Sequence, residues 1–218
     1  MTTDSDLDMF KSLMMVDPKL FMEEQECKTC PIGSYRSNKY LGVAWNTGKL
    51  GVCGTYDDSI PSILFVGLNP SYRRFDFKLR PMFPKTLDEH STGAFFVNAL
   101  FEAKFFNDYK NVYFTNIVKC STPENRELTE TEIKNCKKWF DKELELVKPR
   151  YIVALGSRSF ITVQPYMNEY LNNDINSYKY IVLQMKHPSY YFRSNDSDGM
   201  FDEIKSLIAR LQLAEERF

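Results

Sequence analysis

Residues 63–71 read Ile-Leu-Phe-Val-Gly-Leu-Asn-Pro-Ser, and this stretch decides the fold. The apolar run over 63–66 contains no polar residue and stops at Gly67. A short continuous apolar run is typical of a strand that is buried on both faces, as in a parallel sheet. The Gly, Asn, Pro and Ser that follow favour a turn. The stretch therefore predicts a buried strand that ends in a polar loop.

The same pattern returns along the chain. Apolar runs rich in Ile, Val, Tyr and Phe occupy residues 112–118, 151–155 and 180–185. Helical patterns cover 95–106, 129–147, 157–170 and 199–213, and Thr129 with Glu132 has the spacing of a capping box. Alternating strands and helices predict an α/β fold, a three-layer α/β/α sandwich with a central, mostly parallel four-stranded sheet.

The N-terminal part has a different composition. Residues 1–26 have a helical and partly acidic pattern, whereas residues 31–60 contain several glycines and favour irregular structure. A chain of 218 residues suits one domain. We therefore expect a single domain over 1–218, with 1–60 as an N-terminal extension.

Composition excludes several classes of protein. The formal net charge is −1, so nucleic-acid binding would need local basic patches. No apolar run approaches the roughly 20 residues of a membrane helix. Met1–Met15 lacks the basic and apolar regions of a secretory signal. We expect a cytoplasmic protein, or one in a nuclear or virus-infected-cell DNA compartment, that is not secreted, binds no membrane and is a monomer.

Polar motifs follow each of the four predicted strands. They occupy residues 67–71, 116–120, 156–159 and 187–189. In open α/β sheets, ligands bind outside the carboxyl ends of the strands, so these motifs converge on one place. Each one alone is also compatible with an ordinary strand-to-helix turn.

The cysteines form a second pattern. Cys27 and Cys30 make a close pair, and Cys120 and Cys136 lie far along the chain. Four thiolates bind either zinc or a [4Fe–4S] cluster, and spacing alone does not separate the two. Partly buried free thiols are the other interpretation. Cys53 is a spare cysteine.

The motifs together resemble the uracil-DNA glycosylase superfamily, and in particular its iron–sulfur branch, family 4. The matching stretches are 63–70, 112–120, 125–136, 148–156 and 187–193, together with the first cysteine pair. One position departs from the branch: Leu68 stands where an acidic residue is usual, which gives a Gly-x-Asn-Pro motif.

The resemblance implies a [4Fe–4S] cluster with a structural role. Its ligands would be Cys27, Cys30, Cys120 and Cys136, and the cluster would fasten the N-terminal segment to the loop after the second predicted strand. Zinc is the alternative cofactor. The implied partner is DNA that contains uracil or another damaged base.

The implied activity is that of a monofunctional DNA glycosylase, which hydrolyses the N-glycosidic bond and leaves an abasic site. Catalysis needs a donor at the base oxygen, where charge develops, and a group that places water near the sugar. His187 is the expected donor and Asn69 the expected water ligand. Asn116 matches the N3–H and O4 of uracil, and the backbone near Gly67 and Leu68 would also hold the base.

The base must leave the helix to reach such a pocket. By resemblance Phe83 stacks on the flipped base, with Tyr72 or Phe75 as alternatives. Tyr191 lies where the family inserts a wedge into DNA, with Tyr190 and Phe192 as alternatives. The expected phosphate contacts are Ser71, Arg73, Arg74, Lys78, Arg80, Lys186, Ser189 and Arg193.

Two other functions remain open at this point. Leu68 and the long 31–60 stretch are compatible with a catalytically weak member that serves as a DNA-binding or replication-associated subunit. The Gly-x-Asn-Pro motif is compatible with a glycosylase for hypoxanthine or for a modified or mismatched pyrimidine.

Overall fold

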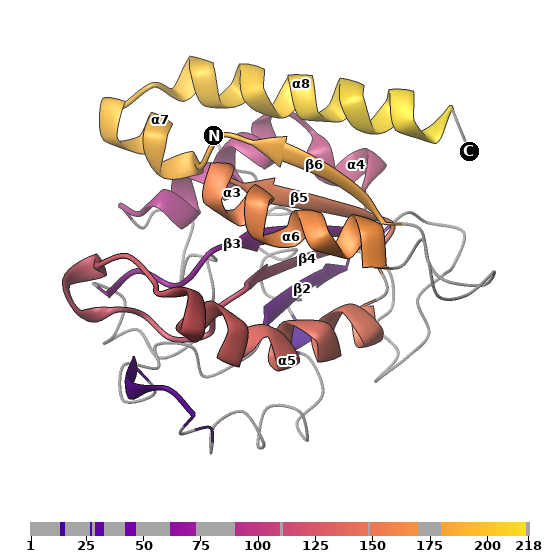
Figure 1. Ribbon diagram of the computed structural model, residues 1–218. Helices are drawn as coiled ribbons and strands as arrows, with labels where there is room; N and C mark the ends of the chain where they lie inside the picture. Colours follow the sequence, from indigo (N-terminus) through magenta and orange to yellow (C-terminus); the bar gives the residue numbers. More distant parts are fainter. Residues whose placement is uncertain are drawn as a thin grey trace.

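A central sheet forms the middle layer of the molecule (Figure 1). The computed structural model describes residues 14–15, 27, 29–32, 42–46, 62–72, 90–109, 111–147, 149–169 and 180–216. Its four parallel strands lie in the order β4-β3-β5-β6. They are β3 (Ser62–Gly67), β4 (Asn111–Asn116), β5 (Tyr151–Leu155) and β6 (Ile181–Met185). The four predicted strands are therefore confirmed.

Two antiparallel strands extend the sheet beyond β4. Strand β2 (Gly42–Asn46) pairs with β4, and the two-residue β1 (Met14–Met15) pairs with β2. The prediction of irregular structure over 31–60 is wrong at 42–46, and the prediction of helix over 1–26 is wrong at 14–15. Pairing with an existing strand overrides the weak local preference of a short, glycine-led segment.

The helices follow the predicted order, with two differences. Helices α5 (Glu130–Val147), α6 (Ser157–Glu169) and α8 (Ser197–Glu215) lie where they were predicted. The predicted helix over 95–106 is two helices, α3 (Thr92–Glu102) and α4 (Phe105–Asp108), because Lys104 has a positive φ of 56°. The seven-residue α7 (Pro188–Ser194) was not predicted.

The helices cover both faces of the sheet, so the three-layer prediction is confirmed. In Figure 1, α3, α4, α7 and α8 lie on one side and α5 and α6 on the other. Successive residues of β3 belong to different cores. Phe65 packs with α3, α4, α7 and α8, while Leu64 and Val66 pack with α5 and α6. The Phe65 ring meets the edge of Phe96 at 5.3 Å between centroids, a favourable aromatic geometry.

A capping box fixes the start of α5, as predicted. The Thr129 N–H donates to Glu132 Oε2 at 2.8 Å, and the Glu132 N–H donates to Thr129 Oγ1 at 3.2 Å. Arg126 adds a two-pronged contact to the same carboxylate, at 3.0 and 2.6 Å. These hydrogen bonds, that from Arg126 first, lower the pKa of Glu132 to about 2. The first turn of α5, which leads to Cys136, is thereby held in place.

None of the helices described here is long and apolar enough to cross a membrane. The organisation of 1–218 as one domain stays a prediction. Cys53 and most of the first 61 residues lie outside the described ranges.

Candidate active site and cysteine pocket

The loops after β3 and β4 leave the sheet side by side. Gly67 pairs with Asn116 at the ends of the two strands. Beyond that point the Ile117 N–H donates to the Gly67 carbonyl at 2.9 Å, and the Val118 N–H donates to the Leu68 carbonyl at 2.8 Å. Two of the four predicted motifs are therefore joined through the backbone. Leu68 packs partly against the core beside α5 and partly against the cysteine cluster.

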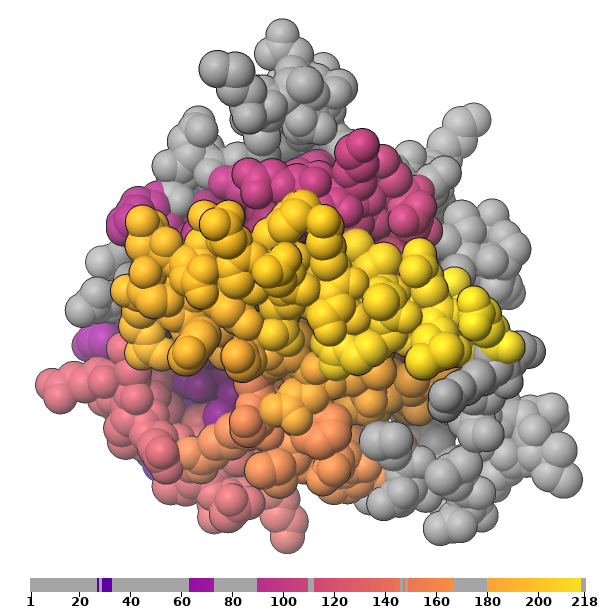
Figure 2. All heavy atoms as spheres, turned by 90° about the horizontal axis from the view of Figure 1, so that it is seen from above, coloured from indigo at the N-terminus to yellow at the C-terminus, as the bar shows by residue number. Residues whose placement is uncertain are grey.

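The loops after β5 and β6 are joined in the same way. The Gly156 N–H donates to the Met185 carbonyl at 2.8 Å, and Gly156 has a φ of 89°. A Cβ at Gly156 would lie 3.3 Å from His187 Cβ. Glycine is therefore required here, because it allows both this backbone conformation and the close approach of His187. Figure 2 shows a hollow at this edge: purple atoms of the 62–72 segment lie at its bottom, between the gold α7 and the salmon loop before α5.

His187 has a defined protonation state. The Ser189 N–H donates to Nδ1 at 3.1 Å, and the Ser189 hydroxyl lies 2.8 Å from the same atom. Because a backbone N–H always donates, Nδ1 is the acceptor and the proton of the neutral ring is on Nε2. Burial, with a smaller contribution from Arg193, lowers the pKa of His187 to about 4. The ring is therefore a neutral donor at physiological pH.

Asn116 is buried without hydrogen bonds to its side chain. It is 1% exposed, and neither Oδ1 nor Nδ2 has a partner within the described part of the chain. A buried polar group left without a partner costs about 1–3 kcal/mol. The side chain thus offers one acceptor and two donors to a ligand.

Asn125 anchors the loop that carries Asn69. Its Oδ1 accepts from the Tyr72 N–H at 2.7 Å and from the Ser71 hydroxyl at 3.3 Å. Asn125 itself has a φ of 57°, which asparagine tolerates better than most residues. The half-buried Asn69 donates from Nδ2 to the Pro70 carbonyl at 3.3 Å, a weak contact that leaves Oδ1 for other donors. The sequence analysis gave Asn125 no role.

The aromatic rings of α7 differ in exposure. Tyr191, the predicted wedge, is only 5% exposed, and its hydroxyl donates to Glu203 Oε2 at 2.8 Å. Burial raises the pKa of Tyr191 well above its usual range. Tyr190 is 57% exposed, and Phe192 packs beside His90 at 5.0 Å between centroids. Tyr191 is therefore buried while Tyr190, one of its two alternatives, is exposed, and the identity of the wedge stays a prediction.

The predicted phosphate contacts have mixed outcomes. The N–H and the hydroxyl of Ser189 both contact Nδ1 of His187, and a contact of Ser189 with DNA stays a prediction. Arg193 is exposed, and its Nε donates to the Ser189 carbonyl at 3.1 Å. The remaining predicted residues Phe83, Arg73, Arg74, Phe75, Lys78 and Arg80 lie outside the described residues.

A buried ion pair that the sequence analysis missed lies below Asn116. Lys119 and Glu143 are both fully buried and in direct contact. Lys119 Nζ also donates to the Asn116 carbonyl at 2.5 Å, and Thr115 Oγ1 donates to Glu143 Oε1 at 2.9 Å. Tyr113 completes the set with a 2.9 Å hydrogen bond from its hydroxyl to Glu143. The network ties the end of β4 to the middle of α5.

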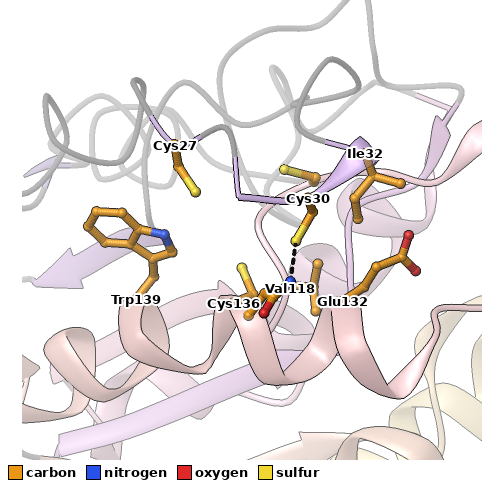
Figure 3. A pocket seen from close by; sticks show the side chains of 9 residues that line it. Cys27, Cys30, Ile32, Val118, Glu132, Cys136 and Trp139 are labelled. Carbon is orange, nitrogen blue, oxygen red and sulfur yellow. Dashed lines mark hydrogen bonds between the residues drawn. The ribbon is translucent and has the colours of Figure 1, made fainter.

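The four predicted cysteines line one pocket beside this network. Cys27 and Cys30 come from the N-terminal segment, Cys120 from the loop after β4, and Cys136 from α5 (Figure 3). All four lie around a cavity of about 20 Å³, whose other lining residues are Ile32, Val118, Glu132, Asn135 and Trp139.

Two N–H groups point at the sulfurs. The Lys119 N–H donates to Cys136 Sγ at 3.3 Å, and Asn135 Nδ2 donates to Cys30 Sγ at 3.4 Å. Such contacts favour thiolate sulfur. No three His, Cys, Asp or Glu side chains in the described ranges form a group at the spacing of ligands of one metal ion. The four cysteines line the cavity.

Comparisons with known proteins identify the family of the chain. The family model described as the uracil DNA glycosylase superfamily matches residues 53–211, well over half of the chain. A Type-5 uracil-DNA glycosylase of Pyrobaculum aerophilum is 48% identical over 24% of this chain and 23% of that protein. A Type-4 uracil-DNA glycosylase of Sulfurisphaera tokodaii is 27% identical over 65% of this chain and 54% of that protein.

A Type-4 uracil-DNA glycosylase of Saccharolobus solfataricus is 23% identical over 77% of this chain and 73% of that protein. The chain therefore spans about half of the Sulfurisphaera relative and less than a quarter of the Type-5 relative. The extent of the family match is nevertheless sufficient for classification. The chain belongs to the uracil DNA glycosylase superfamily, in a branch like that of the Type-4 enzymes.

Proposed function

We propose that this protein excises uracil from DNA by hydrolysing the N-glycosidic bond. The observation that carries the proposal is the buried amide of Asn116, which has no partner among the described residues. Its Nδ2 can donate to O4 of uracil while its Oδ1 accepts from N3–H. Cytosine presents an acceptor and a donor in the opposite places, so it would leave buried polar groups unpaired. A mismatch of this kind supports strong discrimination.

His187 supplies the donor for the departing base. Negative charge develops on the base while positive charge develops on the sugar. A preorganised donor aimed at the developing charge is worth about 10²–10³ in rate. The neutral imidazole donates from Nε2, because Ser189 already occupies Nδ1. Ser189 is thus a positioning residue for His187.

Asn69 places the attacking water. Its Oδ1 accepts a hydrogen bond from water but is too weak a base to remove a proton outright. The carbon–nitrogen bond therefore breaks largely before water attacks. The hydrogen bonds that Asn125 accepts from Ser71 and Tyr72 fix the loop on which Asn69 lies.

DNA is the partner, and the target base leaves the helix to reach Asn116. We assign the exposed Tyr190 to fill the space that the base vacates. Tyr72, which is half-buried next to the catalytic loop, is the described candidate for stacking on the base, and Phe83 remains a prediction. Arg193 and Lys186 are exposed on the same side for phosphate contacts, so binding should weaken with salt.

We further propose that the cysteine pocket holds a [4Fe–4S] cluster. The donor set fits: four cysteine side chains with N–H donors at two of them, in an apolar cavity. In such a cluster each thiolate binds a different iron atom. A single zinc ion needs all four sulfurs at about 2.3 Å from one point. When bound, the cluster fastens Cys27 and Cys30 to the exit of β4 and to α5, and it takes no part in bond cleavage.

One assay tests the activity. The purified protein is incubated with oligonucleotides that contain uracil, hypoxanthine, a modified pyrimidine or only normal bases, and abasic sites are then cleaved with alkali. We expect cleavage of the uracil strand. Cleavage only at another base would replace the substrate assignment, and DNA binding without cleavage of any strand would overturn the enzymatic proposal in favour of a binding subunit.

A second measurement tests the cofactor. Protein purified without oxygen should be brown and contain four iron atoms per chain. A colourless protein with one zinc per chain would overturn the cluster assignment and leave the excision proposal untouched.

A further inference from the structure

The cysteine pocket contains one polar group that no ligand assignment above uses, the indole N–H of Trp139. Trp139 is 6% exposed, and its Nε1 has no hydrogen-bond partner within the described part of the chain. Leaving such a donor unpaired costs about 1–3 kcal/mol. A buried indole N–H almost always finds an acceptor, so the structure calls for one next to Nε1.

The N–H points into the pocket. Figure 3 shows the indole nitrogen on the edge of the ring that faces Cys27 and Cys136. Trp139 follows Cys136 by three residues on α5, a spacing that puts two side chains on the same face of a helix. The cavity wall also includes the apolar side chains of Ile32 and Val118.

The ring is also held from outside. The ammonium groups of Lys138 and Lys142 each lie 5.0 Å from the centroid of the Trp139 ring, within the range of a cation–π contact. The ring is thus fixed between two surface lysines and the cavity. It is a rigid wall that presents one donor inward.

We propose that the Trp139 indole N–H donates a hydrogen bond to a sulfur of the cluster, and that Trp139 thereby sets the reduction potential and the oxidative stability of the cluster. This inference rests on the cluster assignment above. A donor to sulfur stabilises the more negatively charged, reduced form, so it raises the potential. A cluster with a higher potential resists oxidation, which is the first step of its loss in air.

The test compares Trp139→Phe with Trp45→Phe, which alters the only other tryptophan of the chain. Both variants keep an aromatic ring and lose an indole N–H. In anaerobic protein with a full complement of iron, Trp139→Phe should shift the midpoint potential to a more negative value and shorten the lifetime of the brown colour in air. Trp45→Phe should match the parent in both. Unchanged potential and lifetime in Trp139→Phe, with iron content intact, would overturn the inference.

A measurement on the parent protein removes any dependence on how the variant folds. With ¹⁵N-labelled indole, one of the two tryptophan N–H resonances should show a large shift and fast relaxation caused by the cluster. Two ordinary indole resonances from iron-loaded protein would contradict the contact. Protein that binds zinc instead of iron would fail at the earlier step, and the cluster assignment would then be the claim that is wrong.

Discussion

The recognition edge and the cysteine pocket both lie at the end of β4, but their side chains differ in chemistry. At the recognition edge, defined by Asn69, Asn116 and His187, polar groups are buried with donors and acceptors still available. In the cysteine pocket, thiols are gathered within apolar walls. The exit of β4 joins the two regions, because only Ile117, Val118 and Lys119 separate Asn116 from Cys120. In the proposed function, one region receives a transient ligand and the other a permanent one.

The difference explains how the recognition edge can keep the buried amide of Asn116 in place. The Asn116 amide has no partner among the described residues, which is costly, and a strand end would relax around it if nothing held it. The Lys119–Glu143 pair and Cys120 both restrain the segment that follows Asn116. We propose that the permanent site supports the transient one, and breaking each region separately tests that relation.

Loss of the cysteine pocket should have the largest effect. Cys136→Ser removes one proposed ligand, and we expect iron content to fall and Tm to drop by roughly 10 °C or more, because binding of a structural metal centre contributes directly to folding. Iron analysis and calorimetry measure this. Cys53→Ser, at the spare cysteine, should retain both iron and stability, and equal losses in the two variants would refute the ligand assignment.

Breaking the buried ion pair comes next. Glu143→Gln leaves the Lys119 ammonium buried without its carboxylate, and we expect a loss of about 3–5 kcal/mol in the free energy of unfolding. Urea titration gives this value. Glu127→Gln breaks the exposed contact with Arg158 and should change stability little. A Glu143→Gln protein with the same free energy of unfolding as the parent would mean that the pair does not hold the end of β4.

His187→Ala should act on catalysis and leave the fold intact. We expect the single-turnover rate of uracil excision to fall by about 10²–10³, with little change in DNA affinity, because the donor acts on charge that develops only in the transition state. His90→Ala replaces the other histidine, which is exposed and packs beside the ring of Phe192. This variant should remain near the parent rate. A His187→Ala protein as fast as the parent would remove this residue from the mechanism.

A pH titration should give the smallest effect. The folded pKa of His187, about 4, lies below the unfolded value of about 6.5. The unfolded chain therefore takes up the proton first, so this residue's contribution to stability is full above pH 6.5 and is lost as the pH falls toward 4. Arg193→Gln removes a nearby positive charge and should raise the pKa of His187, measured by NMR. A lowered pKa would contradict the stated cause.

Much of the fold was predictable because the signals are local. The apolar runs marked β3, β4, β5 and β6, and Thr129 with Glu132 marked the start of α5. The short β2 was not predictable, since its strand conformation depends on pairing with β4. The break at Lys104 was also hidden, because nothing in the local sequence requires a positive φ there.

The candidate site was predictable to the level of motifs but not of contacts. The four cysteines and the polar residues at strand ends follow from residue type and position. Tyr190 is exposed and Tyr191 is buried because the hydroxyl of Tyr191 reaches Glu203 on α8. This contact spans the turn between two helices, so residue type alone does not predict it. The pairing of Lys119 with Glu143 is equally long-range, so no local pattern predicts it.

The central claim is that the free amide of Asn116 reads uracil. The most direct measurement is the single-turnover excision rate on matched uracil and cytosine oligonucleotides for the parent, Asn116→Ala and Asn107→Ala, whose side chain is exposed on α4. We predict fast excision of uracil alone by the parent and by Asn107→Ala, and a loss of most of the uracil rate in Asn116→Ala while the fold and DNA binding persist. An Asn116→Ala protein that excises uracil as fast as the parent, with the same preference over cytosine, would contradict the account.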